Sequence, residues 1–378
     1  MASRRQVLAS AAAVALAGCQ GSEPRPVERW PQVHFDAANT GYAPGGELPA
    51  DPATTSTSLP SSPVTSAVTS ENRIFFGLDE SHVARDQREG TTGWLVRPSA
   101  GRRPTGTPAV DDDHVYVTER AYHESVESSL LRALEPESGT ESWRVEVDGG
   151  FVLAPTLVDE TLYVRSERGV HAVDVDGTVR WSRDAEQFDP QGFNVVRNIA
   201  PAVGRGVVYA PDTTGVTAYD AETGEEQWHA PVGEVHAAPT LTGETVLIGG
   251  VETGVGAVDA DDGSERWSWD GNTWTSPAVT DGTAYVTGDG LVALDIDTGD
   301  VAWRYDVQSD IFGSPVVVGD SVVVTSISRT HALRREGGLL NSAGEQRWSV
   351  ATGSMSTPTP VATGLTIPAQ EEKLWTVE

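Results

Sequence analysis

A short frame recurs along the sequence, in which an alanine is followed by a tight turn and, ten residues after the alanine, by a tryptophan. The clearest copy, residues 293–303, reads as a strand, an Asp-Thr-Gly turn and a second strand that begins at the tryptophan. Complete copies also span residues 84–94, 133–143, 218–228 and 257–267; a shorter copy spans 172–181, and a degenerate one ends at Trp348. A glycine lies four residues before each of these tryptophans: Gly90, Gly139, Gly177, Gly224, Gly263, Gly299 and Gly344. Glycine tolerates the positive φ that such a turn requires, and tryptophan can cover a neighbouring unit with a large flat surface.

A second marker sets the number of units. A proline that follows a small residue opens an apolar, alternating run at eight places: Pro63, Pro108, Pro155, Pro201, Pro239, Pro277, Pro315 and Pro358. Because proline lacks an N–H, it tends to occupy the first residue of a strand. Self-similarity with a period of about 40 residues is typical of a propeller with four strands per blade. The sequence therefore predicts an all-β fold, an eight-bladed β-propeller of four-stranded antiparallel blades, as a single domain over residues 30–378.

The ends of the chain predict how the ring closes. The last unit opens at Pro358 and stops at Glu378, after about three strands and without a repeat tryptophan. Trp30 stands before the first proline marker. We therefore expect the segment around Trp30 to supply the outer strand of the last blade, which would hide two sheet edges. Trp30 would then be the eighth tryptophan packed between blades, with Trp94, Trp143, Trp181, Trp228, Trp267, Trp303 and Trp348.

Residues 1–19 read as a targeting segment. Arg4 and Arg5 precede an apolar run over residues 7–18, which is too short to span a bilayer and ends at Leu-Ala-Gly-Cys19. The pattern resembles a twin-arginine export signal joined to a lipoprotein box, which implies cleavage before Cys19 and a lipid on that residue. A simple secretory signal with an incidental cysteine is the alternative. Residues 20–29 form a short polar tether, and Cys19 is the only cysteine, so no disulfide can form within one chain.

The charge balance limits the kinds of partner that the protein can bind. Acidic residues exceed basic ones by 55 − 26 = 29 and are spread along the chain. Such a surface suits high salt, where repulsion is screened to within a few ångströms, and this favours a halophilic origin. A surface for cationic partners is the alternative. Nucleic-acid binding is not expected, because phosphate contacts require a basic patch.

Candidate catalytic and metal-binding residues are scattered along the sequence. No phosphate-binding loop or nucleophile elbow is present, and the eight histidines lack metal-ligand spacing. The aspartate-rich turns at 111–113 and 259–262 offer oxygen ligands for Ca²⁺ but lack a spaced set. We therefore predict no catalytic residue and no metal site.

One set of residues at equivalent positions predicts a binding site. The residue three positions before each proline marker is expected near the mouth of the central channel. Five consecutive units place Asn198, His236, Trp274, Phe312 and Met355 there. We hypothesise an aromatic, partly polar funnel that holds a ligand or a loop of a partner. The alternative is that these side chains only plug the channel.

The Ala-x-Asp-x-x-Thr-Gly-x-x-x-Trp frame, matched at every fixed position by residues 218–228 and 293–303, resembles the tryptophan-docking motif of PQQ-type propeller repeats. The resemblance covers nearly the whole chain after residue 30 and implies eight blades with tryptophans packed between them. Two branches share this fold. Quinoprotein dehydrogenases need a pair of adjacent cysteines, a catalytic aspartate and Ca²⁺, whereas BamB-type outer-membrane assembly scaffolds are lipid-anchored and non-enzymatic. Without a cysteine besides Cys19, this chain looks more like the second branch.

On this resemblance, to PQQ-like repeat lipoproteins of halophilic archaeal type, we expect a non-enzymatic scaffold. It would be exported, anchored by lipid on Cys19 at the outer face of the cell membrane, and would bind other exported or membrane proteins. Neither PQQ nor Ca²⁺ is expected as a cofactor. The runner-up is a PQQ-dependent dehydrogenase with its ligand in the funnel, and a lyase or hydrolase of sugar chains is a weaker third reading.

Overall fold

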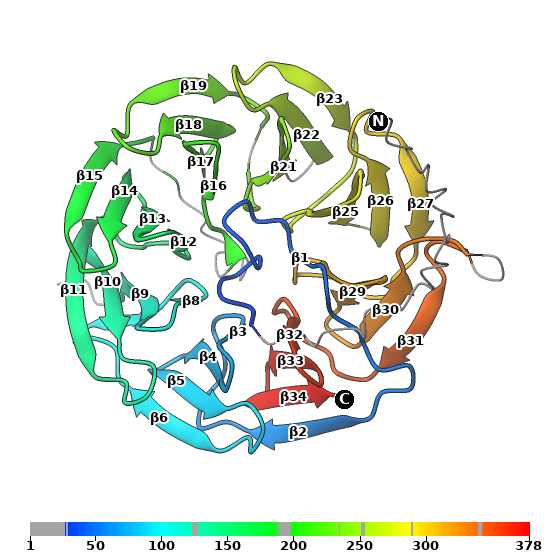
Figure 1. Cartoon of the computed structure of the whole chain (residues 1–378), viewed down its shortest axis with the longest axis horizontal. Helices are drawn as coiled ribbons and strands as arrows, with labels where there is room; N and C mark the ends of the chain where they lie inside the picture. The colour runs from blue at the N-terminus through cyan, green and yellow to red at the C-terminus, as the bar shows by residue number, and fades with distance from the viewer. Residues whose placement is uncertain are drawn as a thin grey trace, which may run out of the picture.

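The computed structural model describes residues 27, 29–122, 128–186, 188, 198–233, 235–250, 254–288, 290–338 and 342–378. In these ranges every regular element is a β-strand, and eight sheets surround a central axis as the blades of a propeller (Figure 1). The predicted eight-bladed, all-β architecture is therefore confirmed. Across the same ranges, no helix long and apolar enough to cross a membrane is found.

Each blade has four antiparallel strands, which follow one another from the axis outward. Blade one consists of β3 (Val68–Thr69), β4 (Arg73–Leu78), β5 (Ser81–Asp86) and β6 (Thr92–Val96), and blade two of β8 (Ala109–Val110), β9 (Val115–Ala121), β10 (Ser128–Leu134) and β11 (Glu141–Asp148). Blade three consists of β12 (Thr156–Val158), β13 (Thr161–Arg165), β14 (Gly169–Asp174) and β15 (Val179–Asp184). Blade four consists of β16 (Ala202–Gly204), β17 (Val207–Pro211), β18 (Val216–Asp220) and β19 (Glu226–Ala230). In blade two, β7 (Arg102–Pro104) also pairs with β9.

Blades five to eight follow the same order. Blade five consists of β20 (Thr240–Thr242), β21 (Thr245–Gly250), β22 (Gly254–Asp259) and β23 (Glu265–Trp269), and blade six of β24 (Ala278–Thr280), β25 (Thr283–Thr287), β26 (Leu291–Asp295) and β27 (Val301–Tyr305). Blade seven consists of β28 (Val316–Val318), β29 (Ser321–Thr325), β30 (Thr330–Arg334) and β31 (Gln346–Val350). Blade eight consists of β32 (Thr359–Val361), β33 (Gly364–Ala369), β34 (Lys373–Val377) and β2 (Thr54–Ser58). A short strand, β1 (Tyr42–Ala43), pairs in parallel with β28.

The recurring frame is the hairpin between the third and fourth strands of a blade. In blade six, Asp295 Oδ1 accepts the N–H groups of Asp297 and Thr298, both at 3.0 Å, and so fixes the turn. Gly299 follows with φ 76°, a conformation that costs glycine little. A register shift after Ala293 then places Trp303 directly opposite that alanine. The frame therefore encodes both the turn and the position of the tryptophan.

The first blade begins later than the proline markers predicted. Its inner strand, β3, starts at Val68, and Ala67 occupies the place that proline holds in the other blades. Pro63 instead forms an isolated bridge with Leu78. The marker failed at this blade because a proline at a strand edge and a proline that opens a strand look the same in sequence.

The ring closes at a segment other than the one predicted. The outer strand of blade eight is β2, which pairs antiparallel with β34 along Thr54–Ser58. The expectation that the segment around Trp30 forms this strand, and that Trp30 is an eighth docked tryptophan, is wrong. Trp30 is fully buried, and it bridges Thr69 in the innermost strand of blade one.

The segment around Trp30 instead crosses the central axis, and we call residues 30–43 the strap. Innermost strands of seven blades donate a backbone N–H to it at 2.6–2.9 Å. The donors and acceptors are Thr69 to Trp30 O, Val110 to Pro31 O, Leu157 to Gln32 Oε1, Val203 to Ala37 O, Leu241 to Ala38 O, Val279 to Thr40 O and Val317 to Gly41 O. In Figure 1 the strap is the blue trace that winds across the centre. It therefore joins blades one to seven before the chain leaves the axis for β2.

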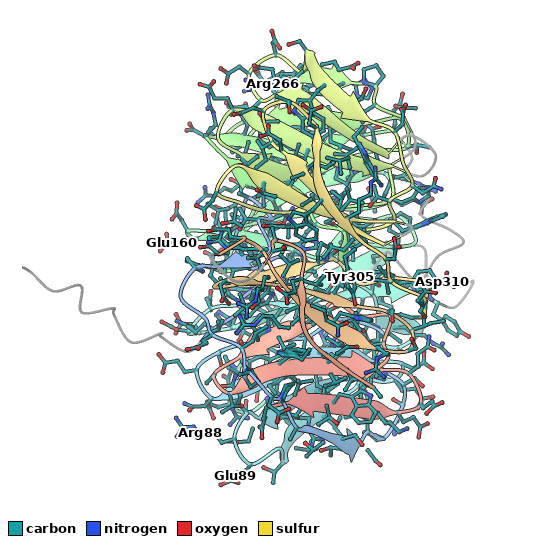
Figure 2. All side chains as sticks on the ribbon, turned by 90° about the vertical axis from the view of Figure 1, so that its right-hand side faces the viewer. Arg88, Glu89, Glu160, Arg266, Tyr305 and Asp310 are labelled. Carbon is teal, nitrogen blue, oxygen red and sulfur yellow. The ribbon has the colours of Figure 1, made fainter. Side chains whose placement is uncertain are left out.

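The two faces of the propeller differ. The strap face carries the strap and the hairpins that contain Glu160, Arg88 and Glu89, on the left in Figure 2. The opposite face carries the connections from the outer strand of one blade to the inner strand of the next, such as the one that contains Asp310 (Figure 2). We call this second surface the crossover face.

Candidate functional site

Seven tryptophans of the outer strands lie on the seams between neighbouring blades. In blades one to seven, one row of paired residues crosses the sheet and ends with alanine in the third strand and tryptophan in the fourth, as in Ala202, Tyr209, Ala218 and Trp228 of blade four. Each such tryptophan faces the next blade.

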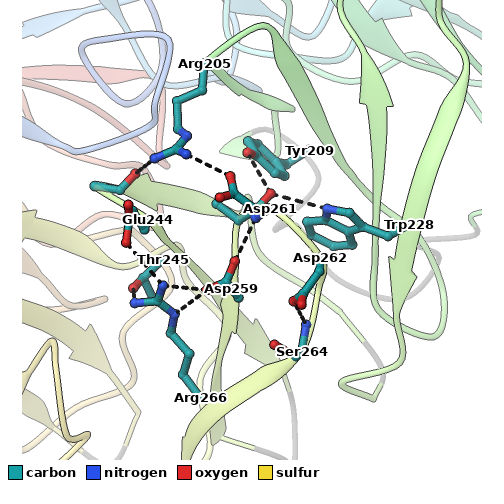
Figure 3. A network of polar contacts seen from close by, with 12 residues as sticks. Arg205, Tyr209, Trp228, Glu244, Thr245, Asp259, Asp261, Asp262, Ser264 and Arg266 are labelled. Atoms are coloured by element: carbon teal, nitrogen blue, oxygen red, sulfur yellow. Dashed lines mark hydrogen bonds and ion pairs between the residues drawn. The ribbon is translucent and has the colours of Figure 1, made fainter.

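Figure 3 shows one of these docked seams, between blades four and five. Trp228 Nε1 donates to the carbonyl of Ala260 at 3.2 Å, and the Tyr209 hydroxyl donates to the same oxygen at 3.3 Å. A β-carbon added to Gly263 would lie 2.6 Å from the indole of Trp228. The glycine therefore serves two purposes, the positive φ of the turn and room for the indole of the preceding blade.

The other docked seams follow this geometry. A β-carbon on the hairpin glycine would meet the preceding tryptophan within 3.0 Å at six seams: Gly139, Gly177, Gly224, Gly263, Gly299 and Gly344. The indole N–H of five tryptophans donates to the carbonyl three residues after the alanine of the next frame, in the pairs Trp94–Pro136, Trp143–Val175, Trp181–Ala221, Trp228–Ala260 and Trp267–Ile296. Trp348 donates to Pro49 instead.

Asn198 lies on the axis and acts as a hub. Its Oδ1 accepts the hydroxyls of Ser66 (2.8 Å) and Thr107 (3.2 Å), and its Nδ2 donates to Thr357 Oγ1 (3.0 Å). These partners belong to blades one, two and eight, whereas Asn198 precedes blade four. The side chain therefore crosses the channel and connects opposite sides of the ring.

The strap is fastened to this hub by a histidine. His34 Nε2 donates to the backbone carbonyl of Asn198 at 2.7 Å, which requires the neutral imidazole to carry its proton on that nitrogen. Burial lowers the pKa of His34 to about 4, although the bond to the Asn198 carbonyl opposes that effect. The channel is therefore closed by the strap and by the hub that His34 joins to it.

The predicted funnel residues divide into two groups. Asn198 is buried in the hub. The other four precede the inner strands of blades five to eight at the crossover face, and all are half-buried: His236, Trp274, Phe312 and Met355. The rings of His236 and Trp274 lie 5.7 Å apart, with an interplanar angle of 48°. Close to Met355, a cavity of about 220 Å³ is also lined by the half-exposed Ile327.

Sequence reasoning missed a buried ion network between blades one and two. The carboxylate of Glu119 is fully buried and contacts His82 (3.2 Å), Arg132 and the N–H of Ser99 (2.8 Å). Burial by itself raises the pKa of Glu119, but the bond to His82 and the charges of His82 and Arg132 outweigh it and lower that pKa to about 2. No short motif marks these residues, because they come from different blades.

A second buried cation lies between blades three and four. The guanidinium of Arg165 is bonded to backbone carbonyls, among them Pro211 (3.1 Å), and burial lowers its pKa to about 10. A cavity of about 430 Å³ beside it is also lined by Asp212 and His229, whose Oδ2 and Nδ1 atoms lie 3.2 Å apart. Since Asp212 also accepts the N–H of Gly215, this carboxylate holds the local turn together.

The described residues do not fit a Ca²⁺-bound quinone. Among the residues that the structure describes, no group of three or more His, Cys, Asp or Glu side chains is placed to hold a metal ion. The five predicted funnel residues include no carboxylate, the donor type that Ca²⁺ prefers. Cys19, Arg4 and Arg5 lie outside the residues that the structure describes, so their predicted roles stay predictions.

The blades, the hairpin frame and the docked indoles together define the class of PQQ-type propellers. Within this class, the chain belongs to the family described as outer membrane protein assembly factor BamB, whose model matches residues 79–286 and 251–376. The predicted resemblance to BamB-type, PQQ-like propellers is therefore confirmed.

Solved structures agree on the fold. BamB from Moraxella catarrhalis is similar with a TM-score of 0.69 and 16% identity, over 87% of this chain and 100% of that one. A quinohemoprotein alcohol dehydrogenase from Comamonas testosteroni has a TM-score of 0.70 and 13% identity, over 94% and 81% of the two chains. A europium-containing methanol dehydrogenase has a TM-score of 0.68 and 12% identity, over 93% and 89%. No curated protein sequence matches the chain. At these identities the likeness concerns the fold, which non-enzymatic and enzymatic proteins share.

Proposed function

We propose that this protein is a non-enzymatic scaffold that binds other exported or membrane proteins through its crossover face. The observation that supports this proposal is the difference between the two ends of the axis. At the strap face, the strap closes the channel with backbone hydrogen bonds to the inner strands. The crossover face carries half-buried Trp274 and Phe312, and half-exposed Ile327 lines a cavity there with Met355. Aromatic and aliphatic side chains at a surface suit protein partners.

The charges around this arc suggest what its partners carry. The connections that hold the aromatic side chains also carry exposed carboxylates, Asp270, Asp306 and Asp310. With a net charge of −29, the whole molecule attracts basic segments. A loop with an apolar side chain flanked by arginine or lysine would complement the funnel.

The same proposal includes export and a lipid anchor on Cys19. Arg29 pairs with Asp112 at the strap face, so the described chain begins on that side. The ten residues 20–29 reach at most about 35 Å when extended. An anchor at Cys19 would keep the strap face toward the membrane and turn the crossover face toward partners. Replacing Cys19 by alanine should release the protein from membranes, with wild type and an Arg4/Arg5 double-lysine variant compared in the same fractionation.

A site-specific photocrosslinker tests the docking surface. Placed at Phe312 on the crossover face, it should yield discrete adducts with other proteins in intact cells. Placed at Glu160 on the strap face as a matched control, it should yield fewer or different adducts. Equal adducts from both positions, or adducts that persist when Trp274 is replaced by alanine, would argue against docking in the funnel.

The quinoprotein alternative has its own test. Trp274 offers a flat surface on which a planar cofactor could stack, paired with His236. We expect no change in absorbance, thermal stability or dye-linked dehydrogenase activity when pyrroloquinoline quinone and Ca²⁺ are added. Stoichiometric binding accompanied by activity would replace the scaffold proposal with an oxidoreductase.

A further inference from the structure

We propose that the seam between blades eight and one is a binding site for a tryptophan side chain of another protein. This seam lies on the ring beside the strap face and is separate from the funnel. It has the receiving half of the tryptophan-docking arrangement and lacks the tryptophan.

Blade eight, which would supply the tryptophan at this seam, has threonines at the corresponding positions. The row of paired residues that ends in tryptophan in blades one to seven reads Thr359, Thr366, Thr376 and Thr55 across blade eight. Thr55, which takes the place of the tryptophan, is exposed. The hydroxyl of Thr366 is buried and has no hydrogen-bond partner. Blade eight therefore offers no indole to blade one.

The receiving side of the seam keeps the hairpin glycine, although buried Arg85 stands where the other frames have Leu, Val or Tyr and its guanidinium donates to the Gly90 carbonyl. Gly90 has φ 65°, like the hairpin glycines at the docked seams, and a β-carbon added to it would meet only Arg85 Nη2, at 4.0 Å. At six docked seams, that space holds an indole within 3.0 Å. Gln87 stands three residues after Ala84, the position whose carbonyl accepts the indole N–H in five other blades. From the residues that the structure describes, the Gln87 carbonyl accepts no hydrogen bond, and the buried Gln87 Nε2 has no partner.

A cavity at this seam reaches Gln87, the residue whose carbonyl would accept the indole N–H. Its volume is about 440 Å³, and its lining includes Gln87 and Arg88 from blade one and Thr363 and Glu378 from blade eight. The carboxylate of Glu71 also lines it. Volumes of this size are typical of small-molecule sites and exceed what one indole needs. The remaining space and the two carboxylates suit a basic residue next to the tryptophan, as in Arg266-Trp267, where the arginine pairs with Asp259 at 2.6 Å.

No tryptophan among the described residues fills this site. All 11 tryptophans lie among the described residues, and seven of them dock at the other seams. Of the remaining four, Trp30 is buried in the strap, Trp269 and Trp274 belong to blade five and the connection after it, and Trp375 lies in β34. None of these lies in the lining of the cavity. We therefore assign the site to an extended segment of a partner protein that carries tryptophan beside a basic residue.

The chain itself supplies a probe and a way to block the site. The probe is a fluorescein-labelled peptide with the sequence of residues 140–147, Thr-Glu-Ser-Trp-Arg-Val-Glu-Val, which is the docked strand of blade two. The blocking variant is Thr55→Trp, which places an indole at the empty position from within the chain. The matched control is Ser56→Trp on the same strand, since alternate side chains of a strand point to opposite faces.

We expect saturable binding of the peptide to the full-length protein, followed by fluorescence polarisation. Replacing the peptide's tryptophan by alanine, or Thr55 of the protein by tryptophan, should weaken binding at least about tenfold. Ser56→Trp should not change it, and Trp274→Ala should not change it either, which separates this site from the proposed funnel. Thr55→Trp should also raise the unfolding temperature by about 1–3 °C, because the indole fills an existing space.

Three outcomes would overturn the proposal. These are no binding of the peptide to wild type, equal binding to the Thr55→Trp and Ser56→Trp variants, or a lower unfolding temperature for Thr55→Trp. A wild-type protein that self-associates while Thr55→Trp stays monomeric in light scattering would assign the site to a second copy of this chain instead of a partner.

Discussion

The seam between blades four and five and the seam between blades eight and one solve the same packing problem with different chemistry. At the first, Trp228 fills the space above Gly263 and donates its N–H to Ala260. At the second, Thr55 leaves the space above Gly90 open. An indole supplies a large apolar surface together with one directed hydrogen bond, which suits a repeated interface.

The eighth seam is held nearer the axis instead. The N–H of Thr357 donates to Ser66 Oγ at 3.0 Å, and Thr359 Oγ1 donates to the carbonyl of Ala67 at 2.8 Å. Asn198 bonds both Ser66 and Thr357. The difference teaches that this seam is held by polar contacts at the hub and by a buried apolar cluster in which Leu374 of blade eight packs with Ile74 and Phe76 of blade one, without the rim tryptophan of the other seams.

The largest effect should come from removing an indole. Trp228→Ala should lower the free energy of unfolding by about 3–5 kcal/mol, the usual cost of truncating a large buried aromatic residue. Thr55→Ala, its counterpart in blade eight, should change that free energy by less than about 0.5 kcal/mol because the side chain is exposed. Denaturant unfolding of both variants measures the contrast. Equal losses would mean that the eighth seam depends on its rim as much as the others do.

Acid should weaken the strap. The pKa of His34 is lowered to about 4 from an ordinary value near 6.5, so the unfolded chain takes up the proton first as the pH falls. The stabilisation is fully present above about pH 6.5 and is lost between about pH 6.5 and 4, on the order of 3 kcal/mol at about 1.4 kcal/mol per unit.

A His34→Gln variant tests this pH dependence, because glutamine can still donate to the Asn198 carbonyl and does not titrate. Its unfolding free energy should fall less between about pH 7 and 5 than that of wild type. Some dependence should remain in this range, because burial also lowers the pKa of His171 to about 4. Identical pH profiles for wild type and variant would show that the strap does not respond to His34.

A smaller loss is expected at the hub. Asn198→Ala leaves the hydroxyls of Ser66, Thr107 and Thr357 without their amide partner, at a cost of about 1–3 kcal/mol. Because these hydroxyls belong to blades one, two and eight, hydrogen exchange should accelerate in β3 and β32 more than in β20. Uniform acceleration in all blades would contradict a hub that serves the eighth seam.

The smallest contrast concerns two glycines with nearly the same backbone. Alanine at position 90 or 263 suffers the strain of a positive φ, 65° and 72° respectively. Only at position 263 does the new β-carbon also approach an indole, at 2.6 Å. Gly263→Ala should therefore be less stable than Gly90→Ala by about 1 kcal/mol or more. Equal stabilities would mean that the indole can shift without cost.

Much of the architecture could be predicted from local patterns. The Asp-x-x-Thr-Gly turn acts within a few residues, since Asp295 bonds the backbone of Thr298 and Gly299 takes the positive φ. The strand period and the tryptophan positions follow from the same frame. The candidate site was harder to predict, because equal spacing placed Asn198 with the half-buried residues of the crossover face although its side chain bonds across the axis.

By itself, the sequence determined the eight-unit repeat, the turns, and the absence of a repeat tryptophan from the last unit. Tertiary structure alone decided that Trp30 belongs to a strap, that β2 closes the ring, and that Gln87 lines a cavity while no indole covers Gly90. The physical reason is the range of the interactions. A turn is stabilised by neighbours in the chain, whereas ring closure joins residues as distant as Thr55 and Thr376, and only the completed ring brings them together.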